Sequence, residues 1–406
     1  MSSEHDSPAL PDRPGRIALV TDGLPPGGST TFLANFAGEL ARRKIPVSVL
    51  SFQKENALAA VFGASKIPVF RQDERRLIFE DRLLAVLGEL RAFQPEIVLA
   101  NLGALSFEVL RYLPPGVFRA GICHTDHFRE RNMMEPHAAH MDLLAAVSAK
   151  IFLDLKADPK FKGVSLKHLP LGVPVPPEAN GARNDPARPL RILCLGRLER
   201  EQKRAHLFPR ILEQLKSSGI PFHWTIAGSG PERDALERAM QSLPDQTVSF
   251  AGQVSYEQVP EVLRAHDIFL LVSDYEGLPL GLLEAMAHGL VPVVSDLPSG
   301  IPEVVDAGNG MLVPVDEVAG YARAIIHLHG HRGELATKSA AARDRVKTEF
   351  SVAAMTNRWL AAFPPTKAHI EPWPNRWRIQ APLTDGNSFY FSPPMRVLRR
   401  LAAKLR

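Results

Sequence analysis

Residues 273–305 read SDYEGLPLGLLEAMAHGLVPVVSDLPSGIPEVV and carry two glutamates, Glu276 and Glu284, separated by seven residues. Gly277 loosens the chain between them, Pro279 suits the first position of a helix, and LGLLEAMAHG predicts a short buried helix closed by its final glycine. Glu284 is therefore expected inside the helix and Glu276 just before it. Because the helix start offers free backbone N–H groups between the two carboxylates, this stretch can hold an elongated anionic ligand by both ends.

The length and composition of the chain indicate two domains. With 406 residues it exceeds the usual size of a single core. The composition, 45% hydrophobic and 23% charged, is typical of a globular protein, and no apolar run approaches the ~18 residues that span a bilayer. We therefore expect a cleft between two domains, and we expect that the chain is not an integral membrane protein.

The N-terminus and the cysteines indicate a cytoplasmic protein. Residues 1–15 are polar and rich in proline, without the basic start and apolar middle of a secretory signal, and predict a disordered leader. Cys123 and Cys194 are the only cysteines, and each lies in a strand-like run, so buried thiols in a reducing compartment are expected. The net charge of +4 suits an anionic substrate or an anionic membrane surface, and we expect no nucleic-acid partner.

Strand-like runs alternate with helical patterns in two series, which is the signature of parallel sheets. The first series comprises RIALV, a helix over 30–43, VSVLSF, a helix over 75–93, and EIVLAN. The second comprises RILCLG, a helix to 216, HWTIAG, a helix to 242, VSFAG, a helix to 265, IFLLVS and PVVSD. Such continuous apolar runs suit strands buried on both faces. The fold class is therefore α/β, with two Rossmann-like halves joined near 174–189.

Glycines follow two of these strands at places that suit a phosphate. DGLPPGGST puts Gly27 and Gly28 at the start of a helix, where the backbone can come close to a ligand, although an ordinary turn is the alternative. IAGSGPE offers Gly228 and Gly230, but Arg233 stands where a dinucleotide motif has its third glycine. We interpret this second pair as a tight turn that can line the nucleotide end of the cleft.

The segment LCLGRLEREQKR places Gly196, Arg197, Lys203 and Arg204 just beyond a strand. Ligands of open parallel sheets bind at this edge, and a diphosphate needs cations. A solvated charged face is the alternative, but the position at the strand end favours one or two of these side chains turning inward.

The histidines are better explained without a metal. Cys123 and His124 would point to opposite faces of a strand, which argues against shared ligation, and His124 at the strand end is expected to hydrogen-bond a substrate. His327, His329 and His331 are attributed to a helix terminus.

The C-terminal region is rich in proline and ends in SPPMRVLRRLAAKLR. The apolar residues of 395–406 can share one face of a helix, with the basic residues elsewhere. A solvated or packed terminal helix is one interpretation, and peripheral contact with an anionic membrane is the other.

Together these motifs resemble the large retaining glycosyltransferase family four, whose GT-B architecture has two facing Rossmann-like domains with an interdomain cleft. The match covers nearly all of residues 16–363. Its most specific part is the opening stretch, because Glu276 and Glu284 fit the family's E-x7-E signature. GRLEREQKR, IAGSGPE and LPLGVPV resemble further family segments.

The resemblance implies a division of the chain into six parts. These are the disordered leader 1–15, an N-terminal Rossmann-like acceptor domain 16–176, a linker 177–189, a C-terminal Rossmann-like nucleotide-sugar domain 190–350, a helix 351–363 returning to the N-terminal domain, and a Pro-rich tail 364–406 with a basic amphipathic helix.

The resemblance also implies roles for single residues. Arg197 and Lys203 would bind the donor diphosphate, and Glu284 the ribose hydroxyls. Glu276 and the backbone after it would hold the donor sugar, and His124 would lie near the reacting carbon. The predicted catalytic residues are Arg197, Lys203, Glu276 and His124. The predicted donor-binding residues are Gly27, Gly28, Gly196, Gly228, Gly230, Gly277, Leu278, Pro279, Leu280 and Glu284.

The activity so implied is transfer of a sugar from a UDP-sugar or GDP-sugar to a hydroxyl of a saccharide or lipid-linked saccharide, for envelope polysaccharide or glycolipid synthesis, at the cytoplasmic face of the membrane. No cofactor and no metal is expected, and the chain lacks the Asp-x-Asp clamp of many sugar transferases. A nucleotide-sugar epimerase or phosphorylase of the same architecture, or a non-catalytic partner subunit that binds nucleotide sugar, is the alternative. Arg204 stands where glycine is common in the family, which leaves the donor identity open.

Overall fold

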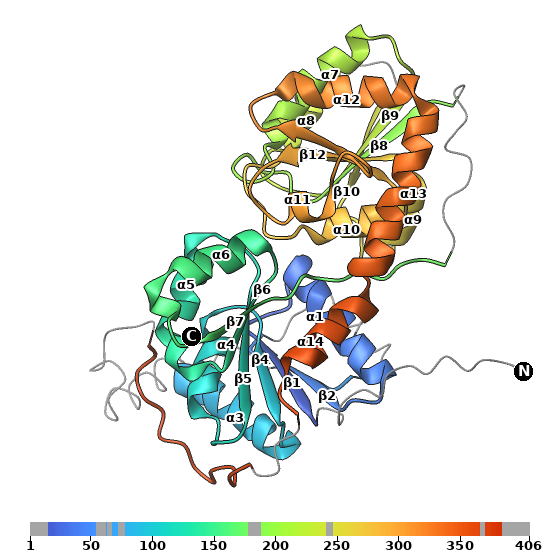
Figure 1. The fold of residues 1–406 in the computed structure, drawn as a ribbon. Coiled ribbons are helices and arrows are strands. Elements are labelled where there is room, and N and C mark those ends of the chain that lie inside the picture. The colour runs from blue at the N-terminus through green and yellow to red at the C-terminus, as the bar shows by residue number, and fades with distance from the viewer. Residues whose placement is uncertain are drawn as a thin grey trace, which may run out of the picture.

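The structure is a computed structural model that describes residues 15–53, 62, 67–71, 78–177, 188–240, 247–365 and 370–383. Nearly all of the predicted leader, most of the predicted linker, and the predicted helix at 395–406 lie outside these residues. The described chain forms two α/β units, each built on a parallel sheet (Figure 1). The predicted α/β fold with two Rossmann-like domains is therefore confirmed.

The first domain has a sheet with the strand order β3-β2-β1-β4-β5-β6-β7 among the described residues. All residues of β1 and β2 are buried, because helices cover both faces of the sheet. The strands are β1 (Ile17–Thr21), β2 (Val47–Ser51), β3 (Val69–Arg71), β4 (Ile97–Ala100), β5 (Phe118–Cys123), β6 (Leu143–Ala146) and β7 (Ser165–His168). The helices are α1 (Gly28–Arg42), α3 (Phe79–Phe93), α4 (Ala104–Val109), α5 (Phe128–Met134) and α6 (Ala149–Ala157), with 3-10 turns η2 (Leu110–Tyr112), η3 (Glu135–His140) and η4 (Pro159–Phe161).

The second domain repeats this plan with the described strand order β10-β9-β8-β11-β12-β13. The strands are β8 (Leu190–Leu195), β9 (Phe222–Ala227), β10 (Val248–Gly252), β11 (Ile268–Leu271), β12 (Val291–Asp296) and β13 (Met311–Pro314). The helices are α7 (Phe208–Ser217), α8 (Arg233–Met240), α9 (Val259–Arg264), α10 (Leu280–Ala287), α11 (Ile301–Val304), α12 (Val318–Gly330) and α13 (Arg332–Glu349), and η5 (Ala205–Leu207) precedes α7.

Each sheet contains a point where the strand order reverses, and this point positions the site. In the first sheet β1 lies between β2 and β4, and in the second β8 lies between β9 and β11. Loops at the carboxyl ends of the strands on either side of such a point leave opposite faces of the sheet and open a crevice. The residues after β1, β8 and β11 are therefore the ones expected at a ligand.

The last described helix, α14 (Val352–Ala362), belongs to the first domain although it follows the second in sequence (Figure 1). Trp359 is fully buried, and its ring centroid lies 5.9 Å from that of Phe32 and 5.6 Å from that of Phe36, both on α1. The chain returns to the first domain at Ser351, which pairs with Val173 in an isolated parallel bridge. The first domain is thus completed by a helix that follows the second domain in sequence.

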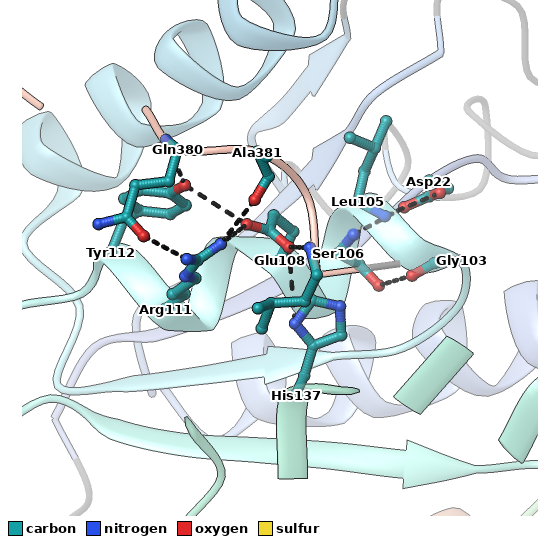
Figure 2. A network of polar contacts seen from close by, with 11 residues as sticks. Asp22, Gly103, Leu105, Ser106, Glu108, Arg111, Tyr112, His137, Gln380 and Ala381 are labelled. Atoms are coloured by element: carbon teal, nitrogen blue, oxygen red, sulfur yellow. Dashed lines mark hydrogen bonds and ion pairs between the residues drawn. The ribbon is translucent and has the colours of Figure 1, made fainter. Parts of the chain in front are cut away.

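The described part of the Pro-rich tail, residues 370–383, forms neither helix nor strand and packs on the first domain. Figure 2 shows Gln380 and Ala381 of this segment beside Arg111 and Tyr112. The carboxylate of Glu108 accepts a hydrogen bond from the backbone N–H of Leu383 at 3.2 Å. Arg111 donates to the carbonyl of Ala381 at 3.0 Å and forms an ion pair with Glu108 at 2.9 Å. At the other end of α4, Asp22 accepts from the N–H of Ser106 at 2.7 Å. Helix α4 is therefore fixed at both ends.

We expect Trp373→Ala to lower the free energy of unfolding of the first domain by about 3–5 kcal/mol, because this indole joins the core and is only 7% exposed. Arg376→Ala, on the exposed side of the same segment, is the matched control and should stay within about 0.5 kcal/mol. Urea unfolding followed by circular dichroism measures both. Equal midpoints for the two variants would show that the segment contributes nothing to the core.

The boundaries differ from the predicted ones by a few residues. The helix predicted over 30–43 begins two residues earlier, at Gly28, and the helix predicted from 75 begins at Phe79, with 72–77 outside the described residues. Among the described helices, none is both long enough and apolar enough for a bilayer span.

Candidate active site

A cleft of about 560 Å³ lies between the two domains, at the carboxyl ends of their strands. It brings together predicted residues from both halves of the chain. Those that line it are Gly27, Gly28, His124, Gly196, Arg197, Lys203, Gly228, Glu276, Gly277, Leu278, Pro279, Leu280 and Glu284. Gly230 does not line the cleft.

Gly230 instead allows two loops to touch. A Cβ built on it would lie 2.2 Å from the carbonyl oxygen of Leu198, and its φ of +154° is one that side chains disfavour. It therefore packs the turn after β9 against the loop after β8. Its neighbour Gly228 lines the cleft and approaches Gly196 in the same way.

Glu276 is buried, with 5% of its surface exposed, and its carboxylate has polar partners. It accepts hydrogen bonds from the ammonium group of Lys203 and from the hydroxyl of Ser273, the latter at 2.8 Å. The amide of Gln202 lies at 3.5 Å. A buried carboxylate requires such partners, and Lys203 supplies the compensating charge. The ion pair places a cation and a polar acceptor side by side in the cleft.

Arg197 lines the cleft, and its side chain is 68% exposed. One guanidinium nitrogen lies 2.7 Å from the amide oxygen of Gln202 and 3.0 Å from the carboxylate of Glu199. Because the side chain is long and mostly in water, it can reach an anion in the cleft by leaving these surface partners.

Arg204 does not line the cleft, whereas Arg197 and Lys203 of the same segment do, as expected for one or two of these side chains. Its guanidinium donates to the carbonyl of Val315 at 2.6 Å and lies 3.2 Å from Asp274. Its backbone has φ +43°, in the left-handed region that glycine adopts without strain. This conformation explains why glycine suits the position.

The helix between the two glutamates forms as predicted, as α10. Pro279 is its N-cap residue, one position earlier than expected, with φ −70° and ψ 111°. The helix closes at Gly289, whose φ is +75°, and the N–H of Leu290 returns to the carbonyl of Ala285 at 3.0 Å. This is a Schellman ending. The first turn of α10 therefore presents its free N–H groups to the cleft.

Glu284 lies within α10 and faces the cleft. Burial raises the pKa of its carboxyl to about 7, since the charged form loses hydration. The pKa of Tyr256, which lines the same end of the cleft, is raised by burial and by the charge of Glu284. Glu284 is thus poised to change its charge near neutral pH.

His124 follows β5 and lines the cleft from the first domain. Burial lowers the pKa of its imidazole to about 4, so the ring is neutral at physiological pH. Its Nε2 lies 2.8 Å from the amide oxygen of Asn101, and its backbone N–H donates to Glu130 at 2.7 Å. The two domains touch here, because a Cβ built on Gly277 would lie 1.9 Å from the carbonyl oxygen of His124.

Further contacts join the domains beside the cleft. The hydroxyl of Tyr256 donates to Asn35 of α1 at 3.2 Å. Glu303 of α11 accepts from the N–H of Ala149 at 2.6 Å and lies 3.0 Å from the imidazole of His168. Near Gly28, a Cβ would be in ordinary contact with Leu280, at 3.6 Å, so the starts of α1 and α10 face one another closely.

Sequence reasoning missed several residues of the site. Glu130 lines the cleft and is 6% exposed, and burial raises the pKa of its carboxyl to about 7. In the sequence it is an ordinary acid in the first turn of a helix, with no sign that it folds back on His124. Asn101 and Ser273 at strand ends could have been suspected from their positions, but nothing local identifies their partners.

His327, His331 and His137 lie outside the cleft. His327 pairs with Glu334 at 2.8 Å and stacks on His331, at the end of α12. His137 is buried in the first domain, 3.7 Å from Glu108 (Figure 2). Within the part of the chain that the structure describes, no group of three or more potential ligands could hold a metal ion.

Part of this chain is similar to proteins that are named as glycosyltransferases. WcaL of Escherichia coli (strain K12), named for colanic acid biosynthesis, is 37% identical over 190 residues, which cover 44% of this chain and 45% of WcaL. The amylovoran biosynthesis glycosyltransferase AmsK of Erwinia amylovora is 36% identical over 172 residues, which cover 40% of this chain and 42% of AmsK. The matched region thus spans less than half the length of either relative.

Solved structures match over a greater length. A TarM variant from S. aureus, in complex with UDP, superposes with a TM-score of 0.70 at 14% identity, covering 86% of this chain and 99% of TarM. HepE from Anabaena in complex with UDP-glucose has a TM-score of 0.68 at 18% identity, covering 86% of this chain and 98% of HepE. The chain therefore has the GT-B fold, and its residues 189–331 match the family model described as Glycosyl transferases group 1.

Proposed function

We propose that this protein is a retaining glycosyltransferase that moves a sugar from a nucleoside diphosphate sugar to a hydroxyl group of a saccharide or lipid-linked saccharide. One observation carries the proposal. A single interdomain cleft combines Arg197, Lys203, Glu276 and Glu284 from the second domain with His124 and Gly28 from the first. The relatives named for colanic acid and amylovoran biosynthesis support a polysaccharide pathway.

Each group has a role in this reaction. Glu284 accepts hydrogen bonds from the ribose hydroxyls, while Arg197, Lys203 and the start of α10 bind the diphosphate. Glu276 and the backbone N–H groups after it hold the sugar. Since Lys203 pairs with Glu276, it lies where diphosphate and sugar would meet.

The chemistry then needs no nucleophile from the protein. The bond between the anomeric carbon and the diphosphate oxygen breaks, and the acceptor oxygen forms a new bond to that carbon from the same face. The acceptor proton passes to an oxygen of the departing diphosphate. Negative charge grows on the diphosphate during this step, and cations held in place stabilise it more in the transition state than before it. We propose that these side chains do so without a metal or other cofactor.

A screen of UDP-sugars and GDP-sugars tests the proposal. Thermal stabilisation identifies the donor, and the labelled donor is then incubated with saccharide and lipid-linked acceptors. A glycosidic product of retained configuration is the expected result. Free epimer or sugar phosphate would assign the chain to an epimerase or phosphorylase instead, and binding without donor consumption would assign it to a non-catalytic subunit.

Donor binding should strengthen as pH rises from 6 to 8, by up to about tenfold per pH unit on the acid side. The reason is that the ionised carboxylate of Glu284 accepts both ribose hydroxyls, and its pKa is raised to about 7 in the free protein. Titration calorimetry at pH 6, 7 and 8 measures the effect. Glu284→Gln should bind weakly with little pH dependence, whereas Glu130→Gln removes the other carboxyl with a pKa near 7 and should keep the dependence. A dependence that survives in Glu284→Gln would assign it to another group.

We also propose a cytoplasmic location, with residues 395–406 contacting an anionic membrane. The two cysteines are buried and free, which suits a reducing compartment. The terminal helix lies outside the described residues, so its support is the pattern of basic and apolar residues alone. Full-length protein should sediment with anionic vesicles, and protein truncated after Pro394 should not. Equal sedimentation would refute the role of this helix.

A further inference from the structure

The imidazole of His124 is held from the side that faces away from the cleft. Asn101 is the residue after β4, and His124 is the residue after the neighbouring strand β5. The parallel register therefore brings both side chains to the same edge of the sheet. The amide oxygen of Asn101 lies 2.8 Å from His124 Nε2. Asn101 is only 1% exposed and does not line the cleft, whereas His124 does.

This contact decides which ring nitrogen carries the proton. The ring is neutral at physiological pH, so one nitrogen is a donor and the other an acceptor. A carbonyl oxygen can only accept a hydrogen bond. With the amide oxygen of Asn101 turned toward the ring, Nε2 carries the hydrogen and Nδ1 presents a lone pair.

The second ring nitrogen, Nδ1, lies on the other side of the ring from Asn101. The hydrogen-bonding directions of the two ring nitrogens diverge, so Nδ1 points away from Asn101, and His124 as a residue lines the cleft. No hydrogen bond to Nδ1 is found among the described residues. Packing also restricts the position of the ring, because Phe32 contacts it edge to face with 5.6 Å between the ring centroids. The backbone of His124 is held by Glu130 at 2.7 Å.

We propose that Asn101 is a positioning residue that keeps His124 in the Nε2–H tautomer, so that Nδ1 accepts a hydrogen bond from a hydroxyl group of the donor sugar. The identity of this hydroxyl donor rests on the proposed function. A fixed acceptor at this place selects a sugar with a hydroxyl there over a deoxy sugar, because the unpaired nitrogen would otherwise be left without its hydrogen bond.

The tautomer can be measured without any substrate. Protein carrying ¹⁵N-labelled histidine gives separate nitrogen signals for protonated and bare ring nitrogens, and the His124→Gln spectrum assigns the resonance. The wild type should show hydrogen on Nε2 from pH 5.5 to 8. In Asn101→Leu the two tautomers should exchange and give averaged signals. A wild-type spectrum with hydrogen on Nδ1, as the reversed Asn101 amide would give, overturns the proposal.

Kinetics with the donor found by the screen supply the second readout. Asn101→Leu should lower kcat/KM by about 10- to 100-fold, as the loss of a residue that orients another residue does. Asn101→Asp should retain the tautomer, because its carboxylate also accepts from Nε2–H. It should also raise the pKa of His124, so that activity falls on the acid side and returns to within a few fold of wild type above that pKa.

Other ionisable groups near this ring also affect the pH profile, so the profile of Asn101→Asp must be compared with that of wild type. Glu130 contacts the backbone of His124, and Lys203, Glu276 and Arg197 line the same cleft from the second domain. Their contributions are present in wild type as well, so only the displacement between the wild-type and Asn101→Asp profiles is attributed to His124. Identical profiles, or wild-type kinetics in Asn101→Leu, would refute the positioning role.

The proposed function and the role of Asn101 can be refuted separately. If no nucleotide sugar binds, the hydrogen bond from a sugar hydroxyl to Nδ1 is refuted together with the transferase function. The tautomer measurement still decides the role of Asn101. If a donor is found and the tautomer is the opposite one, only the role of Asn101 is refuted.

Discussion

Replacing Lys203 or Arg197 by alanine is expected to lower turnover by about 100- to 1,000-fold, as the loss of one preorganised charge-stabilising donor does. Both side chains line the cleft, and both would face the diphosphate as negative charge develops on it. Single-turnover transfer from labelled donor measures the chemical step. A rate near that of wild type in either folded variant would refute the role of that side chain at the diphosphate.

The two variants should differ in stability. Lys203→Ala leaves the buried carboxylate of Glu276 without its cation, so we expect a loss of about 1–3 kcal/mol in the second domain. Arg197 is 68% exposed, and its removal should change stability by no more than about 0.5 kcal/mol.

Arg200→Ala is the matched control for both. Arg200 lies in the same loop and is 64% exposed, and it pairs with Glu232 instead of lining the cleft. Turnover of this variant should be close to wild type. A loss similar to that of Arg197→Ala would show that the loop needs its overall charge, and that no single cation matters.

Gly277→Ala should abolish most of the activity without unfolding either domain. The new Cβ would lie 1.9 Å from the carbonyl oxygen of His124, a backbone atom of the facing domain that cannot rotate away. Ordinary contact begins near 3.4 Å, so the domains would have to separate by roughly 1.5 Å at this point. A displacement of about 1 Å between reacting groups can cost a hundredfold in rate, and we expect at least that loss in kcat/KM.

The control for this variant is Gly333→Ala in the first turn of α13, where a Cβ meets nothing within 4 Å. It should retain full activity. Thermal unfolding of Gly277→Ala should match wild type, because the clash lies between the domains and not within one of them. Full turnover in Gly277→Ala would mean that His124 and Gly277 need not touch during catalysis.

The fold could be predicted from the sequence because its signals are local. Continuous apolar runs such as IFLL mark strands buried on both faces, and the pattern from Pro279 to Gly289 encodes the start and end of α10 within one short segment. The GT-B arrangement was predicted from the resemblance to family four, and the match to solved structures confirms it. The α4 and α5 helices of the first domain were harder to find, since six or seven residues hold too little periodicity.

The partners within the site could not be predicted. Lys203 and Glu276 are 73 residues apart, and nothing in either segment indicates that they form a pair. The contact between His124 and Asn101 depends on the pairing of β4 with β5, and the close approach of His124 to Gly277 depends on how two domains meet. Gly230 was predicted to bind the donor because it lies in a motif typical of ligand sites. In the structure it allows two loops to pack and does not line the cleft.

The return of α14 and of residues 370–383 to the first domain has a consequence for the synthesis of the protein. The surface of α1 that Trp359 covers, and the end of α4 that Leu383 reaches, stay open until the second domain and the residues after it have been translated. Domains usually fold in the order in which they are translated. Here the domain that is translated first is completed last, so the second domain can finish folding while the first still exposes apolar surface.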